Sequence, residues 1–383
     1  MKTRMRHGLV CAAMILAVLV AAGSRHPLAA ADAAEDVDRI FAPFTSSTPG
    51  CAVGVGVDGR PVLARGYGMA DLEHDIPVTA DTIFEGGSLS KQFTAAAVLV
   101  LAREGRLALD DAVRRYIPEL PDYGTPLTIR HMLNHTSGLR DWGSLEGIAG
   151  WPRTTRAYTH AHVLDIVSRQ RALNFTPGTH WSYSNTGYNL AAILVSRVAG
   201  VPFAEFTRAR LFEPLGMTHT SWRDDFTRIV RNRAIAYDAD QASRSYRIEM
   251  PFENVHGNGG LLTTVGDLLK WNEHFWSPAI GDAAFVAEQQ TPVTFSDGAG
   301  HGYGLGLMID RRRGVTQIDH SGSTAGYLAH LARYPDQHVS VAVLCNVSNA
   351  DATQRAYDVA DVRAFFALIN RRLAPCPRLP PVC

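Results

Sequence analysis

Segments that are typical of β-strands lie at both ends of this chain, and a long stretch with helical patterns separates them. Near the N-terminus, residues 51–68 form two apolar runs around Asp58-Gly59, a pattern that predicts a hairpin with a tight turn. The last third of the chain holds four more short apolar runs, at residues 305–309, 316–320, 327–334 and 339–345. We therefore expect one antiparallel sheet built from both ends of the chain.

The middle of the chain, about residues 107–254, has the apolar periodicity of helices. Helices are predicted there at residues 129–133, 160–169, 188–198 and 203–212, and another follows the last strand at 355–368. We expect an α/β lobe at about 32–106 and 255–370, with a helical lobe at about 107–254 inserted between its two parts. A Pro-rich tail follows at 374–383.

Residues 1–31 have the composition of a secretory signal. Basic residues precede an apolar run at 8–23, and three alanines at 29–31 offer a cleavage site. The apolar run is short for a membrane span, which favours a cleaved signal, and an uncleaved membrane anchor is the alternative. We expect an exported protein, periplasmic or secreted, with a single domain at 32–383 and no stable membrane anchor.

The charge and the cysteine content indicate which partners and which cellular compartment are compatible with this sequence. Loss of residues 1–31, which hold four basic residues and no acidic one, leaves 33 basic against 37 acidic residues, and the basic ones form no stripe that would predict a nucleic-acid partner. The four remaining cysteines are Cys51, Cys345, Cys376 and Cys383. An even number is compatible with disulfides in an exported protein. Cys51 could face Cys345 if their strands are neighbours, Cys376 could pair with Cys383, and free thiols stay an alternative.

Only three of the 37 basic residues are lysines, and one of them, Lys91, follows Ser88 by three residues. Arginine can supply a surface cation, but its pKa is too high for it to lose a proton, whereas a desolvated lysine can act as a base. Residues 93–102 are almost wholly apolar and predict a buried helix with Ser88 at its N-terminus and Lys91 on the same face. Although this serine–lysine spacing is common by chance, its setting favours a nucleophile beside its base.

Two further signatures lie downstream. Tyr183-Ser184-Asn185 stands in a polar, aromatic loop that enters a predicted helix, and His320-Ser321-Gly322 stands at the end of a predicted strand. Each is weak by itself, because a capping loop and a strand exit often carry such residues. His131 and His135 have the spacing of a zinc-binding pair, but Met132 stands where a zinc protease has its glutamate, so structural histidines are the better interpretation.

In this order, the three motifs resemble those of the serine β-lactamase and penicillin-binding superfamily. The resemblance is closest to its class C-like branch of β-lactamases, D-alanyl-D-alanine carboxypeptidases, D-aminopeptidases and related esterases. It extends to residues 84–91, 128–139, 257–264 and 303–307, and so over nearly the whole mature chain. It implies a β-lactamase/transpeptidase-like fold of class α/β (α+β), with an antiparallel five-stranded sheet flanked by helices, an inserted all-helical lobe, and the site between them.

The resemblance also implies catalytic roles. Ser88 would be the nucleophile of an acyl-enzyme, which divides one difficult hydrolysis into two easier steps. Lys91 and Tyr183 would share the proton transfers to and from the serine, and the sequence does not choose between them as the base. No metal or organic cofactor is expected.

The remaining motif residues would bind the substrate. Asn185 would form a hydrogen bond with its acyl side chain, while His320 and Gly322 would line the site. By analogy, the backbone N–H of Ser323 would join that of Ser88 in an oxyanion hole.

One departure from the class C pattern bears on the substrate. Those β-lactamases typically carry Lys-Thr-Gly where this chain has His320-Ser321-Gly322, and a histidine is largely neutral at pH 7. The histidine form resembles peptidase and esterase members. We expect an amide or ester substrate such as a D-amino peptide, a cell-wall peptide or a small ester, with two alternatives: a true β-lactamase, and a penicillin-binding sensor that is acylated without turnover.

Overall fold

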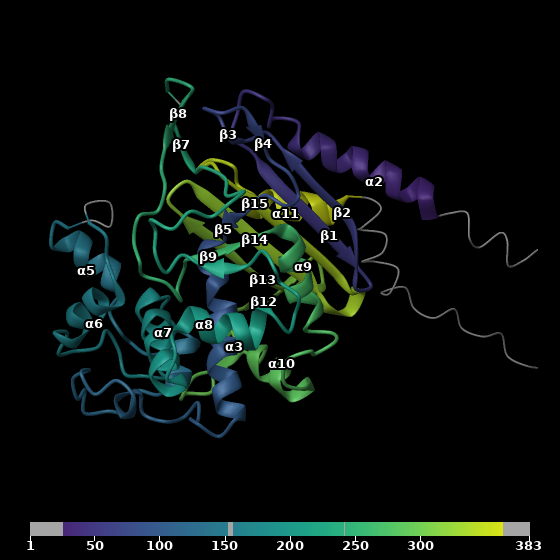
Figure 1. The fold of residues 1–383 in the computed structure, drawn as a ribbon. Helices are drawn as coiled ribbons and strands as arrows, with labels where there is room; N and C mark the ends of the chain where they lie inside the picture. Colours follow the sequence, from purple (N-terminus) through teal and green to yellow (C-terminus); the bar gives the residue numbers. More distant parts are fainter. Residues whose placement is uncertain (1–25, 152–155, 241, 363–383) are drawn as a thin grey trace, which may run out of the picture.

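The computed structural model describes residues 26–151, 156–240 and 242–362, and its centre is one antiparallel sheet (Figure 1). The six strands, in the spatial order β12-β13-β14-β15-β1-β2, are β1 (Cys51–Val57), β2 (Arg60–Tyr67), β12 (Met308–Arg312), β13 (Val315–Thr324), β14 (Tyr327–Tyr334) and β15 (Val339–Cys345). The pairing of β1 with β15 confirms that the two ends of the chain build one sheet. The expected number of five strands was one too low, because β12 pairs with β13 at the edge.

The two faces of the sheet are covered by different helices. Alternate residues of β15, namely Val339, Val341, Val343 and Cys345, pack with α2 (His26–Phe41) and α11 (Ala352–Asp361) in one apolar cluster. Ala342 and Leu344 belong to the larger core on the opposite face, where α9 (Val265–Glu273) lies against β1 and β15. The sheet therefore lies between two helical layers, because successive side chains of a strand point to opposite faces (Figure 1).

The helix α3 (Ser90–Arg103) runs through this larger core, and its residues 90–101 are all buried, as the sequence predicted. The helices of the middle stretch gather beyond it (Figure 1): α4 (Ile129–Leu133), α5 (Trp142–Ile148), α6 (His160–Ser168), α7 (Asn185–Ala199), α8 (Phe203–Thr207) and a π-helical turn (Arg208–Phe212). A further helix, α10 (Ala283–Gln289), comes later in the chain.

Short elements connect these layers. They are β3 (Met69–Asp71), β4 (Ile76–Pro77), β5 (Phe84–Glu85), β6 (Ser221–Trp222), β7 (Tyr237–Asp240), β8 (Ser245–Ile248), β9 (Leu261–Thr263), β10 (Val293–Thr294), β11 (Gly300–His301), and the 3₁₀ turns η1 (Gly87–Leu89), η2 (Val113–Arg115) and η4 (Pro335–Gln337). An all-helical lobe was expected at 107–254, but β6, β7 and β8 fall inside that stretch, so this part of the prediction was wrong. The lobe boundaries themselves stay predictions.

Two strand ends differ from the sequence prediction. The strand expected at 305–309 is β12, displaced toward the C-terminus, because Gly306 adopts φ +79° and packs against the backbone of Lys91, which interrupts an extended conformation there. The strand expected at 316–320 ends later in the chain, because β13 continues to Thr324, which pairs with Tyr327. His320-Ser321-Gly322 therefore lies inside the strand rather than at its end.

Several sequence expectations fall on the chain's two ends. The basic and apolar parts of the expected secretory signal, residues 1–25, lie outside the described residues, while residues 29–31 belong to α2. Cys376, Cys383 and the Pro-rich tail also lie outside them. Among the described helices, none alone is long and apolar enough to cross a membrane; α7 and residues 203–212 pass that test as a pair, bent by 80° between them.

A disulfide joins Cys51 to Cys345, which are direct partners across β1 and β15 and are fully buried. The two cysteines are 294 residues apart in the sequence. Beside the disulfide, Asn346 Oδ1 accepts the backbone N–H of Gly50 at 2.7 Å. This covalent link holds together the two ends of the chain where they share the sheet.

We predict that loss of this disulfide lowers the free energy of unfolding by about 3–5 kcal/mol, because the bond restricts a very long loop in the unfolded chain. Urea unfolding of the oxidised protein should be compared with protein refolded and measured in reductant. The Cys51→Ala/Cys345→Ala variant serves as the control and should not respond to reductant. Equal unfolding midpoints for oxidised and reduced protein would contradict the prediction.

Candidate active site

Ser88 lies in η1 directly before α3, where the sequence placed it, and its loop is anchored on both sides. The backbone N–H of Gly86 donates to Leu261 O at 2.8 Å, and Ser90 Oγ donates to Gly87 O at 2.6 Å. One residue before Gly86, the buried carboxylate of Glu85 forms two hydrogen bonds, of 2.8 and 3.0 Å, with the guanidinium of Arg223. These contacts fix the backbone that presents the serine hydroxyl.

The amine of Lys91 lies among three oxygen atoms from separate parts of the chain. Its Nζ is 3.0 Å from Ser88 Oγ, 2.9 Å from Asn185 Oδ1 and 2.8 Å from the backbone oxygen of Asn258. The whole residue is buried, with 0% of its surface exposed. A buried amine needs such partners, and these three aim it at the serine.

Tyr183 approaches Ser88 from the loop before α7. Its hydroxyl donates to Ser88 Oγ at 2.8 Å, and the centre of its ring lies 4.7 Å from Lys91 Nζ. Although 38% of Tyr183 is exposed, the surrounding atoms desolvate its hydroxyl, and this burial raises the pKa of the phenol well above its ordinary value. The resting phenol is therefore protonated and acts as a donor.

Strand β13 passes so close to η1 that only glycine fits at two positions. A methyl group at Gly322 would lie 2.0 Å from Gly86 O and 3.1 Å from the Ser88 nitrogen, and one at Gly87 would lie 2.6 Å from the Ser323 nitrogen. Gly87 also has φ +50°, which disfavours other residues. The backbones of Ser88 and Ser323 thus lie next to this close approach, and an oxyanion hole formed by their two N–H groups stays a prediction.

His320, two residues before Gly322 in β13, is buried. Burial and the nearby Lys91 lower the pKa of His320 to about 4, so its ring is neutral at pH 7. Its Nδ1 lies 2.6 Å from Ser321 O and its Nε2 lies 3.0 Å from Tyr303 Oη, so both ring nitrogens bond within the protein. Substrate contacts by Asn185, His320, Gly322 and Ser323 stay predictions.

A pocket of about 410 Å³ opens in front of the serine. It is lined by Ser88, Tyr183, His320, Ser321, Gly322, Ser323, Leu328, Ala329, Asp351, Ala352 and Thr353. The sequence analysis assigned no role to Asp351, and it placed Asn258 and Tyr303 in the resemblance without a function. Only the fold brings Asp351 to the pocket wall, the backbone oxygen of Asn258 to Lys91, and Tyr303 to His320, and the spacing of these residues in the sequence does not predict it.

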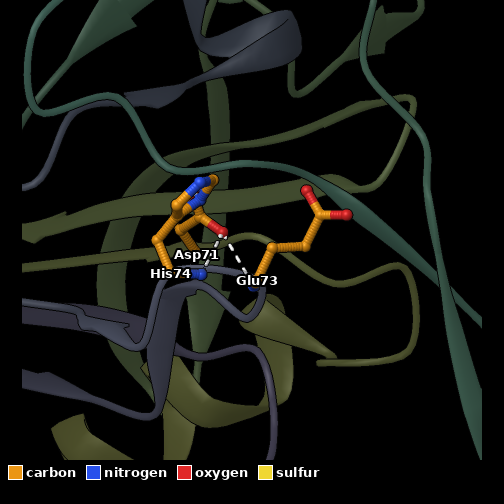
Figure 2. A group of neighbouring side chains, drawn as sticks. All are labelled: Asp71, Glu73 and His74. Carbon is orange, nitrogen blue, oxygen red and sulfur yellow. Dashed lines mark hydrogen bonds and ion pairs between the residues drawn. The ribbon is translucent and has the colours of Figure 1, made fainter.

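A second group of polar side chains lies on the surface at Asp71, Glu73 and His74, where possible metal-ligand atoms come within 4.8 Å of one another (Figure 2). The Asp71 carboxylate accepts the backbone N–H groups of Glu73 and His74 at 2.9 and 3.2 Å, and its other oxygen is 2.8 Å from His74 Nδ1. The Glu73 carboxylate points away from the pair. These contacts are those of a turn, and we assign no metal site here.

Comparison with known proteins finds a matching family and individual relatives. A family model described as Beta-lactamase matches residues 37–364. Penicillin-binding protein 4* of Bacillus subtilis is 29% identical over 300 residues, which are 75% of this chain and 66% of that protein. A D-aminopeptidase of Brucella anthropi is 27% identical over 317 residues, or 82% of this chain and 59% of that protein. The chain thus spans less than two thirds of the length of these relatives.

Solved structures share the fold. The octameric penicillin-binding protein homologue from Pyrococcus abyssi is 27% identical, with a TM-score of 0.75 over 86% of this chain and 76% of that one. A D-amino acid amidase from Ochrobactrum anthropi SV3, complexed with L-phenylalanine amide, is 22% identical, with a TM-score of 0.70 over 86% of this chain and 99% of that one.

We predict that Lys91→Met, which keeps the side-chain volume but removes the amine, slows modification of Ser88 by a fluorophosphonate at least about 100-fold. Intact-mass analysis measures the rate, and Ser88→Ala should take no label. The control Lys270→Met removes an amine that bonds Gly216 O and Asp267 far from Ser88 in the sequence, and should react at the wild-type rate. A Lys91→Met variant labelled as fast as wild type would refute the role of the amine.

We also predict that acid destabilises the fold through its buried histidines. Burial lowers the pKa of His274 and His320 to about 4, and those of His135 and His256 also fall well below the ordinary value. The unfolded chain binds these protons first, so stability is lost as the pH falls from about 6.5 toward 4, by about 1–2 kcal/mol for His274 or His320 between pH 6.5 and 5. Urea unfolding at pH 7.5, 6.5 and 5 tests this. His274→Gln should weaken the dependence, and a constant stability would contradict it.

Proposed function

Because the chain belongs to the β-lactamase family, we propose that it is a serine hydrolase that cleaves an amide or ester bond through an acyl-enzyme on Ser88. One observation carries this proposal: Ser88 Oγ lies 3.0 Å from the Lys91 amine and 2.8 Å from the Tyr183 hydroxyl. A serine with a potential base and a potential acid in direct contact is equipped for nucleophilic catalysis.

The contacts of the two partners suggest how they divide the work. When Lys91 is neutral, its two hydrogens are held by Asn185 Oδ1 and Asn258 O, which turns its lone pair toward Ser88. Ser88 Oγ then attacks the substrate carbonyl and gives its proton to Lys91, while the Ser88 and Ser323 N–H groups stabilise the oxyanion. The protonated phenol of Tyr183 donates to the departing amine or alkoxide.

Deacylation reverses these roles. A water molecule gives one proton to the Tyr183 phenolate and attacks the ester carbonyl of the acyl-enzyme. The bond to Ser88 Oγ breaks, and Lys91 returns its proton to the serine. The enzyme is regenerated with Lys91 neutral and Tyr183 protonated, so that every proton is accounted for.

The charges around the pocket favour a substrate with a free amino group. Among the described residues that line the pocket, Asp351 alone carries a formal charge at pH 7, and His320 is neutral. A substrate carboxylate would meet no cation on these walls, whereas an ammonium group would meet the carboxylate of Asp351. We propose a D-amino acid amide or short D-amino peptide, in line with the D-aminopeptidase relative, with small neutral esters as secondary substrates and carboxylate-bearing β-lactams as poor ones.

Export is part of the proposal. The basic and apolar composition of residues 1–25 is that of a secretory signal. The buried Cys51–Cys345 disulfide favours an oxidising compartment, because cytosolic proteins keep their thiols reduced.

A panel of substrates tests the proposal, with Ser88→Ala as the inactive control. D-alanine p-nitroanilide and p-nitrophenyl butyrate should be turned over by the wild type, the first with the higher kcat/KM. Rapid turnover of a chromogenic cephalosporin would instead favour a β-lactamase. A stable penicillin adduct on Ser88, without turnover of any substrate, would favour a sensor. Equal rates for wild type and Ser88→Ala would overturn the assignment.

We predict that Asp351→Asn raises KM for D-alanine p-nitroanilide by about 2- to 5-fold, the range of a partly exposed ion pair. An asparagine can still accept the backbone N–H of Gln354, which Asp351 Oδ1 accepts at 3.1 Å at the start of α11, so the helix should persist. KM for the uncharged p-nitrophenyl butyrate should not change. An equal change for both substrates would show that Asp351 acts through the fold rather than through charge.

A further inference from the structure

Behind the proposed catalytic residues lies a buried chain of three rings that none of the proposed steps uses. His135 Nε2 is 3.1 Å from Tyr303 Oη, and Tyr303 Oη is 3.0 Å from His320 Nε2. All three residues are nearly or fully buried, with 1%, 0% and 4% of their surfaces exposed. They come from three motifs that the sequence analysis singled out, where His135 was interpreted as a structural histidine and Tyr303 received no role.

The hydrogen bonds at the two ends of this His135–Tyr303–His320 chain determine which of its atoms carry the protons. The backbone N–H of Ser184 donates to His135 Nδ1 at 3.2 Å, so a neutral His135 carries its proton on Nε2 and donates to Tyr303 Oη. His320 Nδ1 faces Ser321 O at 2.6 Å and must donate to it, so His320 Nε2 accepts the hydroxyl proton of Tyr303. One direction of donation, from His135 through Tyr303 to His320, satisfies all four contacts.

The two ends of this three-ring chain contact different segments of the site. His135 holds the loop on both sides of Tyr183, because its backbone oxygen accepts the N–H of Ser182 at 2.9 Å and its Nδ1 accepts that of Ser184. The His135 and Tyr183 ring centres are 4.3 Å apart. The other end, His320, belongs to β13, close in the strand to Gly322 and Ser323.

The backbone of His135 is held by the end of α4. His135 has φ +63°, and the N–H of the next residue, Thr136, donates to His131 O at 3.0 Å, the pattern of a left-handed residue that ends a helix. The imidazole is the group that can bond the Tyr183 loop with one nitrogen and Tyr303 with the other.

We propose that His135 and Tyr303 are positioning residues, which tie the Tyr183 loop to β13 and hold His320 as a neutral hydrogen-bond acceptor. The inference rests on the proposed serine hydrolase and extends it. Through His135, the three rings set the distance between the Tyr183 hydroxyl and Ser88. Through His320, they set the position of the Ser323 N–H. A hydroxyl that donates to His320 Nε2 also opposes protonation of that nitrogen, so His320 stays neutral beside Lys91.

The groups around the three rings keep His135 and His320 neutral. The ionisable groups that face it are Lys91, Tyr183, Tyr188, His301, Asp319 and His330. Burial lowers the pKa of both His135 and His320, and a positive charge on Lys91 lowers both further; for His320 these effects outweigh the opposing effects of the Ser321 backbone hydrogen bond and of Asp319. Loss of the Tyr303 hydroxyl would remove one of the interactions that keep His320 unprotonated.

Tyr303→Phe is the direct test, because it removes the hydroxyl and keeps the ring. We measure modification of Ser88 by a fluorophosphonate as a function of concentration and pH. The maximal rate constant should fall by about 10- to 100-fold, the effect of a misplaced catalytic group, while the half-saturating concentration stays within about 3-fold. The acidic limb of the pH profile should move to higher pH, because His320 becomes easier to protonate.

Tyr334→Phe is the matched control. Tyr334 is a buried tyrosine of β14 whose hydroxyl lies 3.1 Å from Gln317 Oε1, away from the serine, and its loss should change neither the rate nor the pH profile. His135→Asn gives a second variant in case Tyr303→Phe does not fold, since asparagine tolerates the left-handed backbone but is too short to reach Tyr303. It should lower the maximal rate in the same way.

The outcomes separate this inference from the proposed function. If the wild type takes no label at Ser88, the proposed hydrolase itself fails. If the wild type is labelled but Tyr303→Phe and His135→Asn keep its rate and pH profile, the positioning role is wrong. A uniform loss in both variants with an unshifted pH profile and a lowered thermal midpoint would mark the chain as a purely structural element and would also overturn the inference.

Discussion

The buried amine of Lys91 is the contact on which the site depends. An amine that is removed from water must be hydrogen-bonded within the protein, and the three oxygens around Lys91 come from η1, from the start of α7 and from the loop before β9. These segments lie far apart in the sequence. The requirement to satisfy one amine therefore draws together the serine, the amide of Asn185 and the backbone of Asn258, and Tyr183 follows because it precedes Asn185 by two residues.

The sheet supplies the second half of this arrangement. Strands from both ends of the chain pair across β1 and β15, and the Cys51–Cys345 disulfide closes the pair. With the sheet in place, β13 passes η1 at a distance that only Gly87 and Gly322 allow. The same close approach that excludes larger side chains brings the backbone of Ser323 next to that of Ser88, and the N–H groups of these two residues would form the proposed oxyanion hole.

The electrostatics of the site follow from burial. Desolvation keeps His135 and His320 neutral and the phenol of Tyr183 protonated. A neutral His320 also leaves Asp351 as the charged group on the described pocket wall, which is the basis for a proposed substrate with a free amine. The buried histidines would make the same fold sensitive to acid, because each takes up a proton more readily once the chain unfolds.

The sequence by itself determined the local features: the buried helix after Ser88, the hairpin at 51–68, strands β14 and β15 with their ends, and the motifs that resemble the family. Periodicity and short motifs carry such information because they depend on neighbouring residues. The tertiary structure decided the rest. The extension of β13 beyond Gly322 depends on its pairing with β14, and the displacement of β12 depends on Gly306 lying against Lys91. The meeting of His135, Tyr303 and His320 joins residues up to 185 positions apart, and contacts over such separations arise only when the whole chain has folded, since no local pattern specifies them.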